Sequence, residues 1–130
     1  MVKIAKLILC LAWSTPNWLF AQEIKVAPLL SRDLTEFPGK EGTMITVLYP
    51  PGGSESIHRD NAHVFVYVLQ GSIVMQVRGG KEMILTAGQT FYESPNDVHV
   101  IGRNASKTEP AKFVAFFVKD KGTPTHISAK

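Results

Sequence analysis

His58 and Asp60 are the residues of this chain whose types and spacing predict chemistry most directly. In an extended segment, residues two apart project to the same face, so an imidazole nitrogen and a carboxylate oxygen can bind one cation together. His99, which follows a turn at residues 95–97, is the best third ligand. Two nitrogens and one oxygen on one face of an ion leave positions open for substrate and dioxygen, as in non-haem iron enzymes. The sequence therefore predicts a metal site formed by His58, Asp60 and His99.

Each candidate residue also has a purely structural interpretation. Asp60 precedes Asn61, a good turn pair, so its side chain can bond its own backbone. His63 at the start of a strand is an exposed partner for nearby acidic residues, and Glu93 before Ser94 is a solvated edge residue. His126 lies in a polar C-terminal segment that we expect to be a flexible tail over residues 121–130.

The body of the chain reads as short β-strands separated by turns, with no long amphipathic helical period. The expected strands cover residues 44–49, 63–69, 73–78, 82–85, 90–93, 98–102 and 112–118. Residues 22–42 form a less regular leader, with one strand around residues 24–26 that wraps an edge. Several strands at this spacing predict an all-β sandwich or barrel in one domain. Three aromatic side chains are candidates for lining the mouth of a ligand pocket: Phe65, Tyr67 and Phe91.

One stretch carries a family resemblance. Gly52, His58, Asp60, Val64 and Gly71 resemble the first cupin motif, in which a glycine, His-x-His, a glutamate and a second glycine stand at these spacings. A second cupin motif is echoed, with small differences in spacing, by a later set of residues: Gly88, Pro95, Asp97, His99 and Asn104. The resemblance covers residues 44–118 and implies a double-stranded β-helix, a jelly-roll-like barrel, with a cupin domain at residues 43–120.

The same resemblance implies a metal held inside the barrel by three histidines and a glutamate. This chain departs from that set at two of four positions, because Asp60 stands where the second histidine would be and Val64 where the glutamate would be. Three alternatives follow. His58, Asp60 and His99 bind the metal; or His63 or Glu93 fills the vacated position; or the metal is lost and the pocket binds a ligand by shape and hydrogen bonds.

The function expected from this set is action on a small organic molecule, with a divalent metal in the barrel and dioxygenase- or isomerase-like chemistry. Oxygen and nitrogen ligands in a facial triad favour iron or manganese, with zinc or nickel as alternatives. The sequence names no catalytic residue beyond the metal ligands. The second function class is a non-catalytic periplasmic module that binds a small ligand at a degenerate metal site.

Residues 1–21 resemble a secretory signal peptide. Lys3 and Lys6 precede a short apolar run that includes Cys10, and the small residue Ala21 predicts cleavage before Gln22. The expected location is therefore secreted or periplasmic, with no stable membrane anchor after cleavage.

Cleavage changes the charge of this 130-residue chain, which has 14 Lys and Arg against 11 Asp and Glu. The mature form would keep 12 basic and 11 acidic side chains and no cysteine, so its basic character largely disappears. No run of Lys or Arg interleaved with aromatic residues appears, which argues against a nucleic-acid partner. The expected partners are a small-molecule ligand or substrate and, by the family resemblance, a second copy of the chain in a homodimer.

Overall fold

The computed structural model describes residues 22–130, and the signal peptide expected at residues 1–21 lies outside the described residues. Ten strands run through this range: β1 Lys25–Asp33, β2 Lys40–Tyr49, β3 His58–Arg59, β4 His63–Gln70, β5 Ser72–Val77, β6 Met83–Thr86, β7 Thr90–Glu93, β8 His99–Asn104, β9 Ala111–Asp120 and β10 Ile127–Ser128. In the same range no helix is long and apolar enough to cross a membrane.

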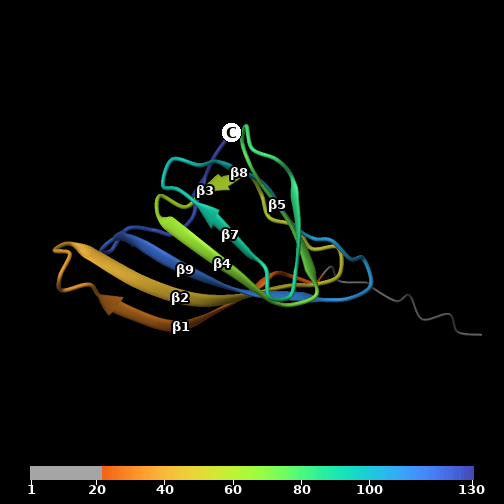
Figure 1. Cartoon of the computed structure of the whole chain (residues 1–130), viewed down its shortest axis with the longest axis horizontal. Coiled ribbons are helices and arrows are strands. Elements are labelled where there is room, and N and C mark those ends of the chain that lie inside the picture. Colours follow the sequence, from red (N-terminus) through yellow and green to blue (C-terminus); the bar gives the residue numbers. More distant parts are fainter. Residues whose placement is uncertain (1–21) are drawn as a thin grey trace, which may run out of the picture.

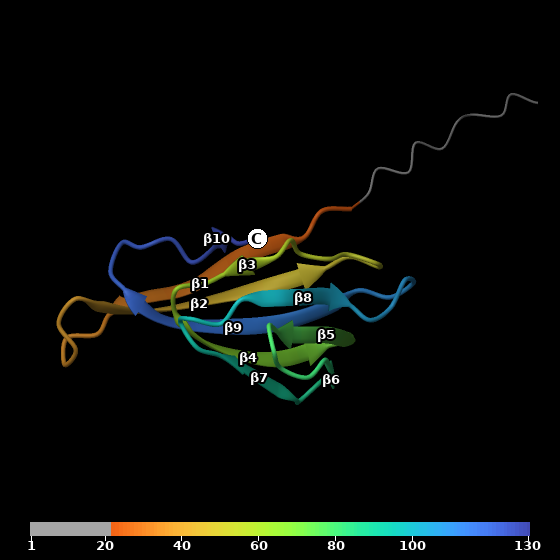
Figure 2. The same ribbon diagram turned by 90° about the horizontal axis from the view of Figure 1, so that it is seen from above.

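The strands form two five-stranded antiparallel sheets that face each other (Figure 1). One sheet has the order β1-β2-β9-β4-β7 and the other β10-β3-β8-β5-β6. The predicted all-β fold is confirmed, although the two sheets are not closed into a barrel. Strands β1 and β10 are the outer strands on one side of the sandwich, and β7 and β6 on the other (Figure 2).

The core lies between the sheets because alternate residues of each strand point inward. In β4, Val64, Val66 and Val68 are buried, whereas His63, Phe65 and Tyr67 are exposed. The same alternation in β9 adds buried side chains from the neighbouring strand of that sheet, among them Phe113 and Phe117. The inward faces of β4 and β9 therefore form one wall of the interior.

Asn104 fixes the loops at one end of the sandwich. Its buried side-chain amide donates hydrogen bonds to the carbonyls of Pro50 (3.0 Å) and Glu109 (2.8 Å), and its oxygen accepts from the backbone N–H of Ser106 (2.8 Å). Its own backbone N–H donates to the Gly53 carbonyl at 2.8 Å. These bonds hold the turn that leads into β3 against the end of β8.

Both ends of the described chain are more regular than expected. The edge strand expected near residues 24–26 extends over Lys25–Asp33 and pairs with β2. The segment expected to be a flexible tail includes β10, whose Ile127 and Ser128 pair with Arg59 and His58 of β3. The structure thus replaces a free tail with a segment docked on the sheet edge.

Candidate metal centre

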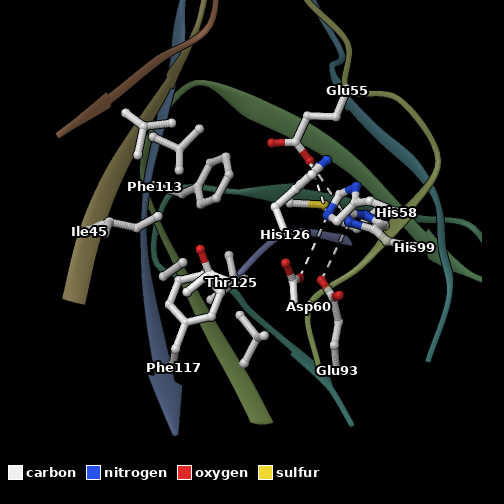
Figure 3. Close-up of a pocket in the computed structure, with 16 residues that line it drawn as sticks. Ile45, Glu55, His58, Asp60, Glu93, His99, Phe113, Phe117, Thr125 and His126 are labelled. Atoms are coloured by element: carbon white, nitrogen blue, oxygen red, sulfur yellow. Dashed lines mark ion pairs between the residues drawn. The ribbon is translucent and has the colours of Figure 1, made fainter. Parts of the chain in front are cut away.

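Strand pairing brings the two predicted histidine ligands together. His58 of β3 lies directly opposite His99 of β8, and their ring centroids are 4.9 Å apart. Both side chains are buried, with exposures of 4% and 3%. Asp60 follows β3 directly, and Glu93 ends β7. The side chains of these four of the five predicted residues converge at one end of the interior (Figure 3).

Glu55 and His126 join this cluster from segments that sequence reasoning did not assign to it. The backbone N–H of Glu55 donates to the Gly102 carbonyl of β8 at 2.8 Å, which holds Glu55 beside the histidines. The ring of His126 stacks on that of His58 at 4.2 Å between centroids and 25° between planes. An acidic residue three positions before His58 was a usable signal in the sequence, whereas nothing local to His126 indicated its position.

The orientation of His58 is fixed by the backbone. Its Nδ1 lies 2.8 Å from the Ser56 carbonyl, so Nδ1 carries a proton and donates it. Its Nε2 lies 3.6 Å from Asp60 Oδ2 and 3.8 Å from Glu55 Oε2. A backbone carbonyl that holds one ring nitrogen and leaves the other free is the usual outer support of a metal-binding histidine.

His99 has one nitrogen near carboxylates and the other without a partner. Nδ1 lies 3.6 Å from Glu93 Oε1 and 3.9 Å from Glu55 Oε2, while the buried Nε2 makes no hydrogen bond. Gly102 leaves the space for this arrangement, because a Cβ there would lie 2.9 Å from the His99 ring and 3.0 Å from Glu55 Oε2. A buried nitrogen without a hydrogen-bond partner lowers the stability of the fold unless a ligand or an ion binds it.

These separations suit an ion better than direct hydrogen bonds. Four ligand atoms at zinc-like bond lengths of about 2.1 Å in a tetrahedron lie about 3.4 Å apart, longer than a hydrogen bond and slightly shorter than the 3.6–3.9 Å seen here. A contraction of a few tenths of an ångström would bring the side chains to bonding distance of a shared cation. The donor set of imidazole nitrogens and carboxylate oxygens fits a divalent metal.

Two overlapping groups of ligand atoms share His58. One consists of Glu55, His58 and His99, and the other of His58, Asp60 and His126, each with its atoms within 4.8 Å of one another. Among the described residues, the predicted set of His58, Asp60 and His99 is not itself such a group. The structure keeps both predicted histidines and Asp60 in the cluster and adds one candidate ligand to each group, Glu55 to the first and His126 to the second.

Glu93 lies beside the position at which the first motif lacks its glutamate. It lies directly opposite Val64 in the pairing of β4 with β7, and it is 3% exposed. Residues directly opposite in a ladder project to the same face, so Glu93 supplies a carboxylate beside the position of the missing one. His63, the other candidate for the vacant position, does not reach the cluster. It points to the outer face of β4, where its Nδ1 contacts the Tyr92 hydroxyl at 2.7 Å.

The cluster concentrates negative charge without a fixed cation. Its carboxylates come from Glu55, Asp60 and Glu93, and none of the described residues that line the adjoining cavity is a lysine or arginine. Burial and the Asp60 charge raise the pKa of Glu93 to about 8, and burial raises the pKa of Glu55. Buried anions of this kind need a proton or a cation to offset their loss of water.

The histidines respond in opposite directions. Burial lowers the pKa of His58, but Asp60, the Ser56 carbonyl and Glu55 outweigh it and raise the pKa to about 9. Burial and then the neighbouring His58 charge lower the pKa of His99 to about 4. The same two causes lower the pKa of His126. In the metal-free protein the proton on His58 therefore offsets part of the charge of the carboxylates.

A cavity of about 140 Å³ adjoins the cluster. The carboxylates and histidines form one end, and apolar side chains such as Ile45, Phe113 and Phe117 form the other (Figure 3). A cavity of about 150 Å³ holds a molecule the size of benzene. The space therefore suits a small organic molecule with one polar end.

The three aromatic candidates for this pocket lie elsewhere. Phe65 and Tyr67 are each 49% exposed on the outer face of β4, because the two-residue alternation that buries the valines turns them outward. Phe91 is half-buried, with its ring 6.4 Å from that of His99, but it does not line the cavity. With Phe116, these aromatic residues line a shallow outer groove instead.

Comparison with known families gives one match, to the cupin domain, over residues 45–117. No curated protein matches the sequence significantly. The match spans both motifs and contains five of the six cluster residues, whereas His126 lies beyond it.

Solved structures of the same fold support this match. A double-stranded β-helix protein from Klebsiella pneumoniae aligns with a TM-score of 0.65 and 17% identity over 85% of this chain and 89% of its own. An oxalate oxidase in complex with glycolate aligns with a TM-score of 0.61 and 26% identity over 88% of this chain and 57% of its own. The dimethylsulfoniopropionate (DMSP) lyase DddQ from Ruegeria pomeroyi aligns with a TM-score of 0.60 and 17% identity, over 68% and 43%. This chain thus spans about half the length of the two enzymes.

Proposed function

This chain belongs to the cupin family, and from that premise we propose that its buried cluster binds one divalent metal ion and that the protein acts on a small organic molecule in the adjoining cavity. The observation that carries the proposal is the composition of the cluster. Three largely buried carboxylates and three histidines meet around His58, and no lysine or arginine among the described lining residues balances them. A divalent cation would supply that balance.

We propose four ligands, His58 with Glu55, Asp60 and His99 around it. The metal we propose is iron or manganese. His58 would bind through Nε2, since Nδ1 is held by the Ser56 carbonyl. Binding requires neutral imidazole, so the proton on His58 must leave as the metal enters. When bound, such an ion supplies a Lewis acid with open positions that polarise an oxygen of the substrate.

The chain's own residues supply the rest of the site. The apolar walls hold the body of a small molecule and exclude water from its polar end. Glu93, whose carboxyl group lies 3.6 Å from His99 Nδ1 at the polar end of the cavity, can donate a proton to a bound oxygen or accept one back. This set supports proton-transfer chemistry of the isomerase type as well as an oxidation.

The oxalate oxidase provides independent support for a small oxygen-bearing substrate. It shares 26% identity with this chain and was solved with glycolate, a small hydroxy acid. A molecule of that size fits a cavity of about 140 Å³. We propose a substrate of this general class, an organic molecule of a few heavy atoms that carries a metal-binding oxygen.

Elemental analysis of the purified protein tests the metal proposal. We expect one equivalent of iron or manganese in the wild type and less than a tenth of that in His58→Ala, with intermediate losses in Asp60→Ala and Glu55→Ala. His63→Ala is the matched control, since it removes an imidazole from the outer face and should keep the full equivalent. A wild type that contains no metal and takes up neither iron nor manganese would refute the proposal.

A second candidate is a ligand-binding module without turnover. The altered motif favours it, because two of the four usual ligand positions hold Asp60 and Val64. Stoichiometric binding of a small molecule by a protein that lacks metal and turns nothing over would support this candidate.

Export and pairing complete the proposal for the working protein. We propose secretion or periplasmic location after cleavage before Gln22, and an intact mass that begins at Met1 in the secreted fraction would contradict it. We also propose a homodimer, which sedimentation equilibrium would distinguish from a monomer.

A further inference from the structure

The C-terminal segment closes one edge of the cavity. After β9 the chain leaves its sheet, runs along the side of the sandwich on which β1 lies, and joins the opposite sheet as β10 beside β3 (Figure 2). Thr125 and His126 of this crossing line the cavity. We call residues 123–130 the C-terminal clasp.

Register places His126 at the cluster. Ile127 and Ser128 pair with Arg59 and His58, and continuation of that antiparallel register puts His126 opposite Asp60. Residues in these positions share a face, which explains why the ring of His126 stacks on His58 at 4.2 Å. Figure 3 shows His126 beside His58 at the polar end of the cavity. Its ligand atom, with those of His58 and Asp60, forms one of the two candidate ligand groups.

Few bonds hold the clasp. Its ladder with β3 has two residue pairs, and outside the ladder the Ala129 N–H donates to the Ile57 carbonyl at 3.2 Å. Lys119 Nζ donates to the Thr123 carbonyl at 2.6 Å, and Arg78 donates to the Lys130 carbonyl at 2.7 Å. His126 is itself exposed. A segment with so few contacts opens at low free-energy cost, so an added bond from His126 would change its docking measurably.

We propose that His126 binds the same metal ion as His58 and Asp60, and that this bond docks the C-terminal clasp over the loaded cavity. The inference rests on the proposed function and extends it from a metal held inside the fold to a site completed by the chain's last strand. The metal and the clasp then stabilise each other. By reciprocity, the factor by which the clasp strengthens metal binding equals the factor by which metal strengthens clasp docking.

Co²⁺ binding to the full chain, followed by its visible absorption, measures the first factor. We expect His126→Ala and His126→Phe each to weaken Co²⁺ binding about 10- to 100-fold and to change the absorption bands, because both lack the nitrogen donor. His126→Phe keeps a ring that can stack on His58, so it separates ligation from stacking. His63→Ala, on the outer face, should bind as the wild type does.

Hydrogen exchange of the Ala129 amide measures the second factor. Saturating Co²⁺ should slow its exchange by the same 10- to 100-fold in the wild type and leave it unchanged in His126→Phe. Wild-type affinity in His126→Phe, or exchange that ignores metal in the wild type, would overturn the inference while the proposed function stands. Absence of any Co²⁺ or Mn²⁺ binding by the wild type would overturn both.

Discussion

The buried charge cluster predicts an unusual pH dependence of stability for the metal-free protein. His58 has a pKa of about 9 in the folded state against 6.5 ordinarily, so its stabilisation is present below pH 6.5 and lost as the pH rises to about 9. Glu93 has a pKa of about 8 in the folded state against 4.5 ordinarily, so its contribution to stability is likewise lost as the pH rises from 4.5 to 8. The pKa of His99 is lowered to about 4, so its effect on stability has the opposite pH dependence. Its contribution is lost as the pH falls from 6.5 to 4.

The magnitude follows from the protons that the folded protein retains. Between pH 6.5 and 8, His58 and Glu93 together hold between one and two protons that the unfolded chain has released. The free energy of unfolding should therefore fall by about 1.4 to 2.7 kcal/mol per pH unit. Between pH 4.5 and 6.5 the contributions of Glu93 and His99 offset each other, so stability should be nearly constant. A bound metal replaces the protons and should remove the decline.

Urea unfolding at pH 5.5, 6.5, 7.25 and 8, in EDTA and in saturating Mn²⁺, measures this profile. Glu93→Gln is the control, because the amide keeps the shape of the side chain without its titration, and it should reduce the slope above pH 6.5 to less than about 1.4 kcal/mol per unit. A free energy of unfolding in EDTA that stays flat or rises between pH 6.5 and 8 would show that the cluster does not hold these protons, and the charge argument would fail.

Three substitutions test the supports of the site. Gly102→Ala places a Cβ 3.0 Å from the Glu55 carboxylate, so the free energy of unfolding measured in urea should fall by about 1–3 kcal/mol. Co²⁺ titration should show weaker binding. Unchanged Co²⁺ affinity would show that the close approach of Gly102 to Glu55 is not needed. Asn104→Ala leaves buried carbonyls without donors and should lower the free energy of unfolding by about 2–4 kcal/mol. Asn104→Asp should be at least as destabilised, because its carboxylate cannot donate to those carbonyls. Val64→Glu adds a carboxylate opposite Glu93, so the metal-free protein should melt at a lower temperature. Combining it with Glu93→Gln should restore the melting temperature. A double variant no more stable than Val64→Glu alone would contradict this placement of the two side chains.

The fold was predictable because the strands repeat with clear turns and the two motifs have recognisable spacing. The sequence predicted less well which face of its strand each residue occupies. In β4 both alternating sets are apolar, Val64 and Val66 on one side and Phe65 and Tyr67 on the other, so the sequence alone did not decide which set points inward. The smaller valines face the cavity, and the aromatic residues expected there lie outside.

The cluster was predictable where the ligands are local and not where they are remote. His58 and Asp60 sit two residues apart, and the motif gave His99 its place. His126 reaches the cluster only because β10 pairs with β3 in one register, a contact across almost seventy residues. Glu55 lies in a loop whose position depends on a backbone bond to Gly102. Pairings of this kind come from tertiary structure and leave no local pattern.

Anomalous diffraction from crystals grown with Mn²⁺ would locate the proposed metal ion. We expect one strong peak within bonding distance of His58 Nε2 and of at least one carboxylate oxygen from Glu55 or Asp60. His58→Ala crystals grown in the same way should lack the peak. A peak at the outer face, or none inside the cavity at saturating Mn²⁺, would contradict a metal site centred on His58.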